Sequence, residues 1–145
     1  MNKVEDIKYQ AVAISTGGRG GKGYSHNPDV TMKLDMPQEL GGKGEGTNPE
    51  QLFAIGYGAC FQGALALAGK AKGVSVEGSK VRTTVGLGPE GDSFAIKAGL
   101  EVAIPGMELA QVQELADLTH ELCPYSKAIR GNVEVTVRAV ENIED

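Results

Sequence analysis

Apolar residues recur at every second position in four stretches of the chain, which is the period of a half-buried β-strand. These stretches cover residues 7–13, 30–36, 81–87 and 94–104. The last two flank Gly88-Pro89-Glu90-Gly91-Asp92 and predict a long antiparallel hairpin. Val133, Val135 and Val137 predict one more strand near the end of the sequence.

A different pattern marks the middle of the chain. No charged residue occurs between Glu50 and Lys70, and Asn48 followed by Pro49 is a typical helix start. The segment is long enough to cross a membrane. Glutamines and glycines dilute its apolar character and strand-like stretches flank it, so we interpret residues 48–71 as a buried helix instead.

A second helix is predicted by an apolar stripe at helical spacing, formed by Leu109, Val112, Leu115, Ala116, Thr119 and Leu122. Strands and helices in 145 residues favour a single α+β domain, residues 1–145, with an antiparallel sheet wrapped around the long buried helix. Four glycines within that helix favour close packing against the sheet or against a second copy of the helix.

Composition narrows the setting of the protein. The net charge is −5 and no basic stripe occurs, which argues against nucleic acid or an anionic membrane as a partner. The charged first residues contain no signal-peptide pattern, so we expect a cytoplasmic protein. The sequence holds two cysteines and no C-x-x-C motif, and a disulfide in that compartment would be catalytic rather than structural.

Cys60 lies within the uncharged helix and has two interpretations. Burial among apolar residues raises the pKa of a thiol above its usual value of about 8.5, which would leave Cys60 an inert packed side chain. Reactivity requires a nearby cation. Lys70 and Lys72 lie about 15 Å further along the helix axis. Arg19 lies in the loop Gly17-Gly18-Arg19-Gly20-Gly21, where it is either a solvated side chain or this cation.

Glu50 lies in the first turn of the same helix, where the helix dipole favours a carboxylate. It is about 15 Å along the axis from Cys60, so one arginine cannot easily touch both within one chain. If Arg19 bridges them, the glutamate would most simply come from a second subunit. We therefore expect an intertwined homodimer.

Cys123 ends the second helical stripe, immediately before Pro124. It either terminates this helix or begins a new turn, where free backbone N–H groups would lie beside its sulfur. His120 and Cys123, with His26 as a distant third residue, could ligate a metal. The remaining ligands of a four-coordinate site are missing, so we expect no metal.

Several separate motifs follow one another over essentially the whole chain: Gly17-Gly18-Arg19, Leu40-Gly41-Gly42, Gly46-Thr47-Asn48-Pro49-Glu50-Gln51-Leu52-Phe53-Ala54, Gly58-Ala59-Cys60-Phe61, Cys123-Pro124-Tyr125-Ser126 and Arg130-Gly131-Asn132. Together and in this order they resemble the organic hydroperoxide resistance proteins, a group within the superfamily of osmotically inducible proteins. Ile55 and Gly58 depart from the alanine or other small residue that this family leads us to expect. These departures concern the shape of the substrate pocket more than the chemistry.

The resemblance implies a thiol-dependent peroxidase that reduces alkyl and fatty-acid hydroperoxides to alcohols. Cys60 would be oxidised to a sulfenic acid, and Cys123 would resolve it as an intramolecular disulfide. Arg19 and Glu50 would activate Cys60 and orient the peroxide. No resident cofactor is implied, because a lipoyl dithiol, free or protein-bound, would serve as the reductant.

An apolar pocket would favour an organic peroxide over hydrogen peroxide. The residues expected to line it, together with Arg19, are Phe53, Ile55, Phe61 and Met36. Two alternatives remain. A related member of the superfamily could use another peroxide or another reductant, or the chain could be a redox-sensing or small-ligand-binding module in which the disulfide acts as a switch without turnover.

Overall fold

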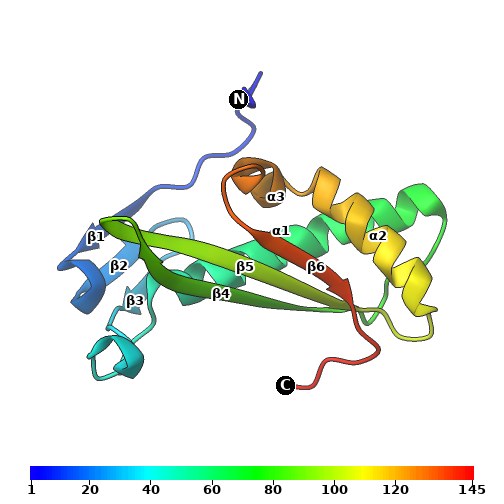
Figure 1. The fold of residues 1–145 in the computed structure, drawn as a ribbon. Helices are drawn as coiled ribbons and strands as arrows, with labels where there is room; N and C mark the ends of the chain where they lie inside the picture. Colours follow the sequence, from blue (N-terminus) through cyan, green and yellow to red (C-terminus); the bar gives the residue numbers. More distant parts are fainter. The chain divides into compact units, whose positions relative to one another are not determined.

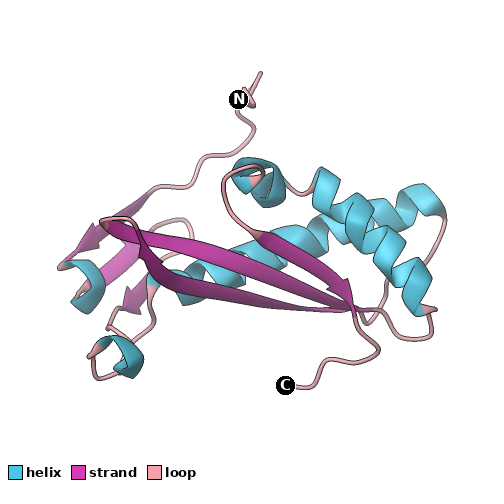
Figure 2. Ribbon diagram, in the orientation of Figure 1, coloured by secondary structure: helices cyan, strands magenta, loops and turns pink.

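The structure is a computed structural model that describes residues 1–145. Its chain forms two compact units, residues 1–52 and 53–145, and each is described by itself. The prediction that both make one domain stays a prediction. Figures 1 and 2 show the elements of both units.

The first unit is built around a small antiparallel sheet in the order β1-β2-β3. Its elements are the strands β1 (Ala13–Thr16), β2 (Lys22–Ser25) and β3 (Val30–Lys33) and the short 3₁₀ helices η1 (Gly18–Gly20) and η2 (Gln38–Leu40). After β3, Leu34 forms an isolated bridge with Thr47, which brings the chain to the start of the long helix α1 (Pro49–Lys72).

The prediction of a strand over residues 7–13 is wrong for all but its last residue. β1 begins at Ala13, which pairs with Ser25, the last residue of β2. The chain then turns through Asn27, whose φ is +60°, so β2 offers no further backbone groups to pair with residues 7–12. Without a partner strand these residues have no regular structure, and Tyr9 is 79% exposed.

The glycine loop is confirmed and has a steric reason. Gly17 and Gly18 have φ values of +73° and +57°, a region that side chains disfavour. A Cβ at Gly21 would lie 1.8 Å from the carbonyl oxygen of Thr16, so only glycine fits. The loop folds into η1, which carries Arg19.

The second unit contains most of α1 and a three-stranded sheet in the order β4-β5-β6. Its other elements are β4 (Lys80–Glu90), β5 (Ser93–Ala103), α2 (Leu109–Leu122), α3 (Pro124–Ile129) and β6 (Val135–Ala139). The long hairpin is confirmed, with Glu90 paired to Ser93 across the two-residue turn Gly91-Asp92.

The predicted α+β fold with a long helix packed on an antiparallel sheet is confirmed, except that the last strand, β6, pairs parallel to β5. Two helices, α2 and α3, lie between these strands in sequence. This crossover returns the chain to the sheet in the same direction, as parallel pairing requires. α1 and α2 cover the same face of the sheet in Figure 1, and side chains of all three pack in one core.

α1 is buried along one side rather than all round. The side chain of Asn48 accepts a hydrogen bond from the backbone N–H of Gln51 at 2.9 Å, which confirms the predicted N-cap. Tyr57, Phe61, Leu65 and Ala68 are fully buried and form the core. The opposite side is open, and its apolar residues include Ile55 and Leu67, 67% and 65% exposed.

The length and composition of α1 would also suit a membrane span, since its most apolar window has a mean hydropathy of 1.5. A third of that window is buried in the structure. The residues buried are those that pack on the sheet and on α2, so the helix has the position of a core element.

Candidate functional site

The two cysteines lie next to each other in the second unit. Cys60 is half-buried on α1, and Cys123 is fully buried in the link between α2 and α3. Both are free thiols, and their sulfurs are 3.7 Å apart. A disulfide has an S–S length of about 2.04 Å, so a small approach of the two side chains would join them.

The local sequence explains the position of Cys123. Pro124 cannot continue α2 and instead begins α3, which leaves Cys123 extended between the helices, with φ −63° and ψ 124°. The N–H of Cys123 donates to the carbonyl of Thr119, and its own carbonyl accepts from the N–H of Lys127. Cys123 therefore ends one helix and stands at the start of the next, as both interpretations allowed, but its side chain makes no capping hydrogen bond to α3.

Burial raises the pKa of the Cys60 thiol, as expected for an apolar helix. A backbone N–H of Tyr125 acts in the opposite direction by donating a hydrogen bond to Cys60, whereas the neighbouring Cys123 raises the pKa further. The environment therefore disfavours the Cys60 thiolate, and its reaction as a nucleophile needs further stabilisation of that thiolate.

An aromatic cluster adjoins the cysteines. The rings of Phe53, Tyr57 and Tyr125 lie with centroids 5.9 to 6.1 Å apart, and Tyr57 and Tyr125 are stacked at 29°. A Cβ at Gly56 would be 3.3 Å from the Tyr125 hydroxyl. Glycine at this position therefore lets Tyr125 approach α1 closely.

Tyr57 and Ser126, both fully buried, form with the half-buried His120 a polar network that the sequence analysis missed. The Ser126 hydroxyl lies 2.8 Å from the Tyr57 hydroxyl and 2.8 Å from His120 Nδ1. The sequence offered one indication of this network, namely that His120 and Ser126 each lie three residues from Cys123, one before it and one after it.

In the first unit, Arg19 and Glu50 form the predicted bidentate ion pair. Both guanidinium nitrogens lie 2.8 Å from a carboxylate oxygen of Glu50. The hydrogen bond from Arg19 is the largest effect on Glu50 and lowers its pKa. The expectation that this glutamate would come from a second subunit is wrong, because both residues belong to one chain.

The expected pocket residues have different environments. Phe61 is fully buried in the core and Phe53 packs against that core, whereas Ile55 is largely exposed. Met36 is half-buried in the first unit, where its carbonyl accepts a hydrogen bond from the N–H of Gly44. Their role as a pocket lining stays a prediction.

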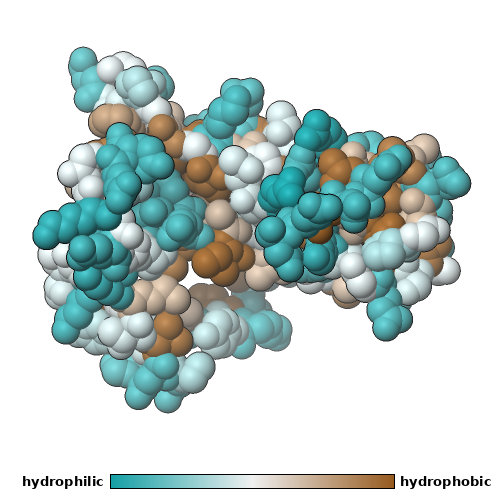
Figure 3. Space-filling model, turned by 90° about the horizontal axis from the view of Figure 1, so that it is seen from below, coloured by the Kyte–Doolittle hydropathy of each residue, from teal (hydrophilic) through white to brown (hydrophobic).

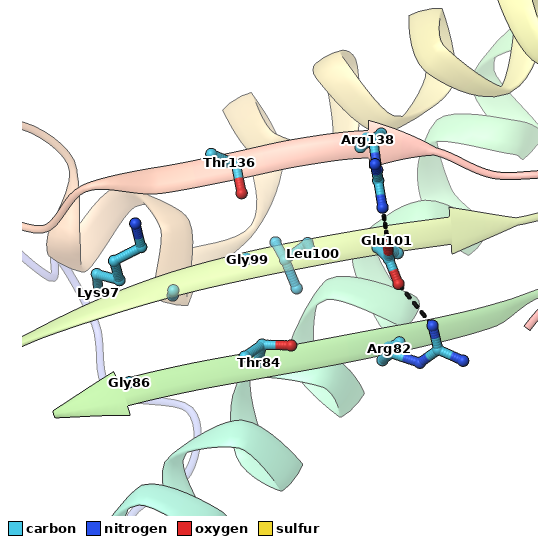
Figure 4. Close-up of a pocket in the computed structure, with 10 residues that line it drawn as sticks. Arg82, Thr84, Gly86, Lys97, Gly99, Leu100, Glu101, Thr136 and Arg138 are labelled. Carbon is cyan, nitrogen blue, oxygen red and sulfur yellow. Dashed lines mark hydrogen bonds and ion pairs between the residues drawn. The ribbon is translucent and has the colours of Figure 1, made fainter.

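A concave region, a trough of about 680 Å³, lies on the face of the β4-β5-β6 sheet that points away from the cysteines (Figure 4). Two rows of side chains across the three strands form it: Arg82, Glu101 and Arg138, and Thr84, Gly99 and Thr136. Glu101 accepts hydrogen bonds from both arginines. This row therefore places one carboxylate between two guanidinium groups.

No group of three or more His, Cys, Asp or Glu side chains converges as a metal site in the described chain, residues 1–145. Each of the three residues considered from the sequence has a partner of its own. His26 lies 2.6 Å from the carboxylate of Asp29, His120 bonds Ser126, and Cys123 contacts Cys60.

The fold and the paired thiols define a class: small α+β proteins in which two neighbouring cysteines are available for redox chemistry. A family model for OsmC-like proteins matches residues 42–138, which is more than half of the chain and includes both cysteines. The chain belongs to this family.

Individual relatives agree with the family match. The chain is 44% identical to an organic hydroperoxide resistance protein of Xanthomonas axonopodis pv. citri, over 94% of this chain and 98% of that relative. Among solved structures, it is similar to an organic hydroperoxide resistance protein from Elizabethkingia anophelis, with a TM-score of 0.87, 37% identity and coverage of 96% and 100%. OhrB of Bacillus subtilis gives a TM-score of 0.83, 38% identity and coverage of 92% and 100%.

Proposed function

We propose that the protein is a cysteine-based peroxidase that reduces organic hydroperoxides to alcohols. The observation that carries this proposal is the contact between two free thiols, 3.7 Å apart, in a member of the OsmC-like family. A nucleophilic thiol with a second thiol beside it is the arrangement that a two-cysteine peroxidase requires.

In the first step, the Cys60 thiolate attacks the terminal oxygen of the hydroperoxide and breaks the O–O bond. The alkoxide leaves and takes up a proton to become the alcohol, and Cys60 becomes a sulfenic acid. Cys123 then attacks the Cys60 sulfur, the S–O bond breaks and water leaves, which produces the disulfide. An external dithiol reduces this disulfide, and a lipoyl dithiol, free or protein-bound, is the proposed reductant.

Arg19 and Glu50 are the proposed activating pair. The bidentate bonds to Glu50 hold the guanidinium plane in one orientation. An oriented guanidinium is suited to stabilise both a thiolate and the departing alkoxide. Cys60 needs such stabilisation because burial raises its pKa.

The first prediction tests this role of the arginine. Arg19→Ala should slow the oxidation of Cys60 by at least tenfold, about 1.4 kcal/mol of activation free energy, without affecting the later attack by Cys123. Stopped-flow measurement of the first oxidation step gives the rate directly. An unchanged rate would remove Arg19 from the mechanism.

Phe53, Ile55, Phe61 and Met36 are proposed as the apolar lining that favours alkyl and fatty-acid hydroperoxides. Part of this set can make such contacts from its present position, since Ile55 is 67% exposed and Phe53 is half-buried. The preference would appear as a higher rate constant with an alkyl hydroperoxide than with hydrogen peroxide.

We also propose that the protein acts as a homodimer in the cytoplasm. The support for the dimer is the open apolar side of α1, where Ile55 and Leu67 are exposed next to small residues such as Ala59 and Gly63. Figure 3 shows apolar side chains open to solvent on one face of the molecule. A second copy of the same helix would cover such a surface.

The test of the proposed function is the intact mass of the reduced protein after one equivalent of an alkyl hydroperoxide, with remaining thiols capped by an alkylating agent. The expected result is loss of two hydrogens, no cap, and one equivalent of alcohol. If both thiols are capped and the peroxide remains, the peroxidase proposal is wrong.

Turnover separates this proposal from its alternative. With a dithiol supplied, a peroxidase consumes many equivalents of peroxide. A redox-sensing or small-ligand-binding module would be oxidised once and would stop.

A further inference from the structure

A chain of three hydrogen-bonding side chains connects all the helices around the cysteines. Tyr57 comes from α1, His120 from α2 and Ser126 from α3. The Ser126 hydroxyl lies 2.8 Å from each of the other two polar groups. Tyr57 and Ser126 are fully buried, so their hydroxyl groups depend on each other for partners.

The positions of these residues relate them directly to the two sulfurs. Tyr57 precedes Cys60 by three residues and therefore lies on the same side of α1. His120 and Ser126 flank Cys123 at three residues on each side. The network thus fastens both ends of the link that carries Cys123 to the helix that carries Cys60.

With an uncharged imidazole, one arrangement of protons uses both hydroxyl hydrogens within this network. The Tyr57 hydroxyl donates to the Ser126 oxygen, and the Ser126 hydroxyl donates to His120 Nδ1. Burial lowers the pKa of His120, and Arg130 lowers it further, against the smaller opposite effects of Glu121 and Asp117. The neutral imidazole remains available as the acceptor.

Arg130 supports the same network from outside. Its guanidinium donates a 2.6 Å hydrogen bond to the carbonyl of His120, and its backbone N–H donates to the carbonyl of Ser126. The two helix ends on either side of Cys123 are therefore held together by one residue.

We propose that Tyr57, Ser126 and His120 are positioning residues that set how readily Cys60 and Cys123 close into a disulfide. The inference rests on the proposed function in giving that disulfide a role. Its physical basis is orientation: the sulfurs already lie 3.7 Å apart, and holding reacting groups in place raises their effective concentration by orders of magnitude. If the link that carries Cys123 were less firmly held, the effective concentration of one sulfur at the other would fall.

The test measures the disulfide equilibrium of the full chain in glutathione buffers, which needs no peroxide. In this equilibrium glutathione disulfide oxidises both thiols of the protein, and two molecules of reduced glutathione are released. Tyr57→Phe and Ser126→Ala should each lower the equilibrium constant at least tenfold, which corresponds to about 30 mV. Tyr57→Phe retains the stacked ring and removes only the hydroxyl.

Thr119→Val is the matched control. Thr119 is a fully buried residue of α2 whose hydroxyl bonds the carbonyl of Leu115, outside the network. Valine has nearly the same size as threonine and lacks only the hydroxyl, so this substitution should change the equilibrium constant of disulfide formation by less than twofold. Circular dichroism and thermal unfolding establish that each variant is folded, and Tyr57→Phe decides the matter if Ser126→Ala does not fold.

Two results would overturn the inference: equilibrium constants of both network variants within twofold of wild type, or an equal fall in Thr119→Val. A wild-type protein that forms the disulfide with glutathione but consumes no peroxide would contradict the proposed function alone. With peroxide, the same variants should oxidise Cys60 at the wild-type rate and close the disulfide more slowly.

Discussion

At the scale of single residues, the two cysteines differ in what surrounds them, and this difference is consistent with the order of reaction that we propose. Cys60 is half-buried, whereas Cys123 is fully buried and held by backbone hydrogen bonds on both sides. A hydroperoxide that arrives from solvent can reach Cys60 more easily. The structure therefore supports Cys60 as the sulfur that is oxidised first and Cys123 as the one that resolves it.

Cys123→Ser should leave Cys60 open to over-oxidation by the peroxide. Without the second thiol, the Cys60 sulfenic acid persists and reacts with further peroxide to the sulfinic acid. Mass spectrometry after several equivalents of an alkyl hydroperoxide should show two added oxygen atoms on Cys60 in this variant and a disulfide in the wild type. Protection of Cys60 in the absence of Cys123 would contradict the resolving role.

The ion pair of Arg19 and Glu50 makes a prediction about pH and stability. Arg19 lowers the pKa of Glu50 in the folded protein below the usual value of 4.5, so the pair stabilises the fold fully above about pH 4.5. This contribution is lost as the pH falls through the lower, folded pKa. The difference in unfolding free energy between wild type and Glu50→Gln should therefore be constant from neutral pH to about pH 5 and shrink in more acidic buffers.

Glu114→Gln provides the control for this measurement, because Glu114 is exposed on α2 and forms no ion pair. Its effect on the unfolding free energy should be small at every pH. A Glu50→Gln difference that stays constant down to pH 3 would show that the pair does not contribute through its charge.

At the scale of elements, α1 shows how glycines place a helix close to a sheet. A Cβ at Gly58 would lie 2.8 Å from Thr83 Oγ1 on β4, closer than real Cβ contacts. That hydroxyl is buried and has no hydrogen-bond partner. Gly58 therefore lets α1 approach β4 closely at the Thr83 hydroxyl, whose burial is not compensated by a hydrogen bond.

This contact predicts coupling between the two positions. Alanine in a helix is favoured over glycine by about 1 kcal/mol, but in Gly58→Ala the clash with Thr83 should cancel that gain. In a Thr83→Ala background the clash is absent, so adding Gly58→Ala should raise the unfolding free energy by about 0.5 to 1 kcal/mol. Additive effects in this double-mutant cycle, measured by denaturant unfolding, would contradict the contact.

The same scale shows what the sequence could reveal. The alternating pattern predicted β4 and β5 because both strands bury one face against α1, and the Asn48-Pro49 start predicted the beginning of that helix. The segment before Ala13 has an equally regular pattern but is not a strand, since β2 ends at Ser25. An alternating pattern shows which residues favour burial, but it does not show whether a neighbouring strand is present to pair with them.

The site was predictable to the extent that its chemistry is confined to a few residue types. Two cysteines, one arginine in a glycine loop and one glutamate at a helix start were all singled out in the sequence. The Tyr57 and Ser126 contact was not, because hydroxyl groups are common and nothing local indicates that residues 69 positions apart share a hydrogen bond. The origin of Glu50 was misjudged for a related reason, since spacing along a helix does not show how a loop folds back.

At the scale of the whole molecule, the uncovered side of α1 is the feature that a single chain does not explain. If a second copy covers it, Leu67→Glu places a charge in an apolar interface and should shift the protein to the monomer mass in light scattering. Leu109→Glu, at a 42% exposed position on α2, is the control and should leave the mass unchanged. A wild-type protein with the mass of one chain would contradict the dimer.

If the proposed disulfide forms, the burial of Cys123 determines which of its two sulfurs an external reductant attacks. A reducing thiol must approach a disulfide in line with the bond and attack one of the two sulfurs, and only Cys60 offers a route from solvent. Cys123 is then always the leaving group, and the reductant is held for a moment by a covalent bond to Cys60. Because the departing Cys123 thiol stays beside that bond, it can attack again and expel the reductant. A reductant with a second thiol of its own can displace Cys60 from this bond before Cys123 returns, so under the proposed function the burial of one sulfur would favour dithiols over simple thiols.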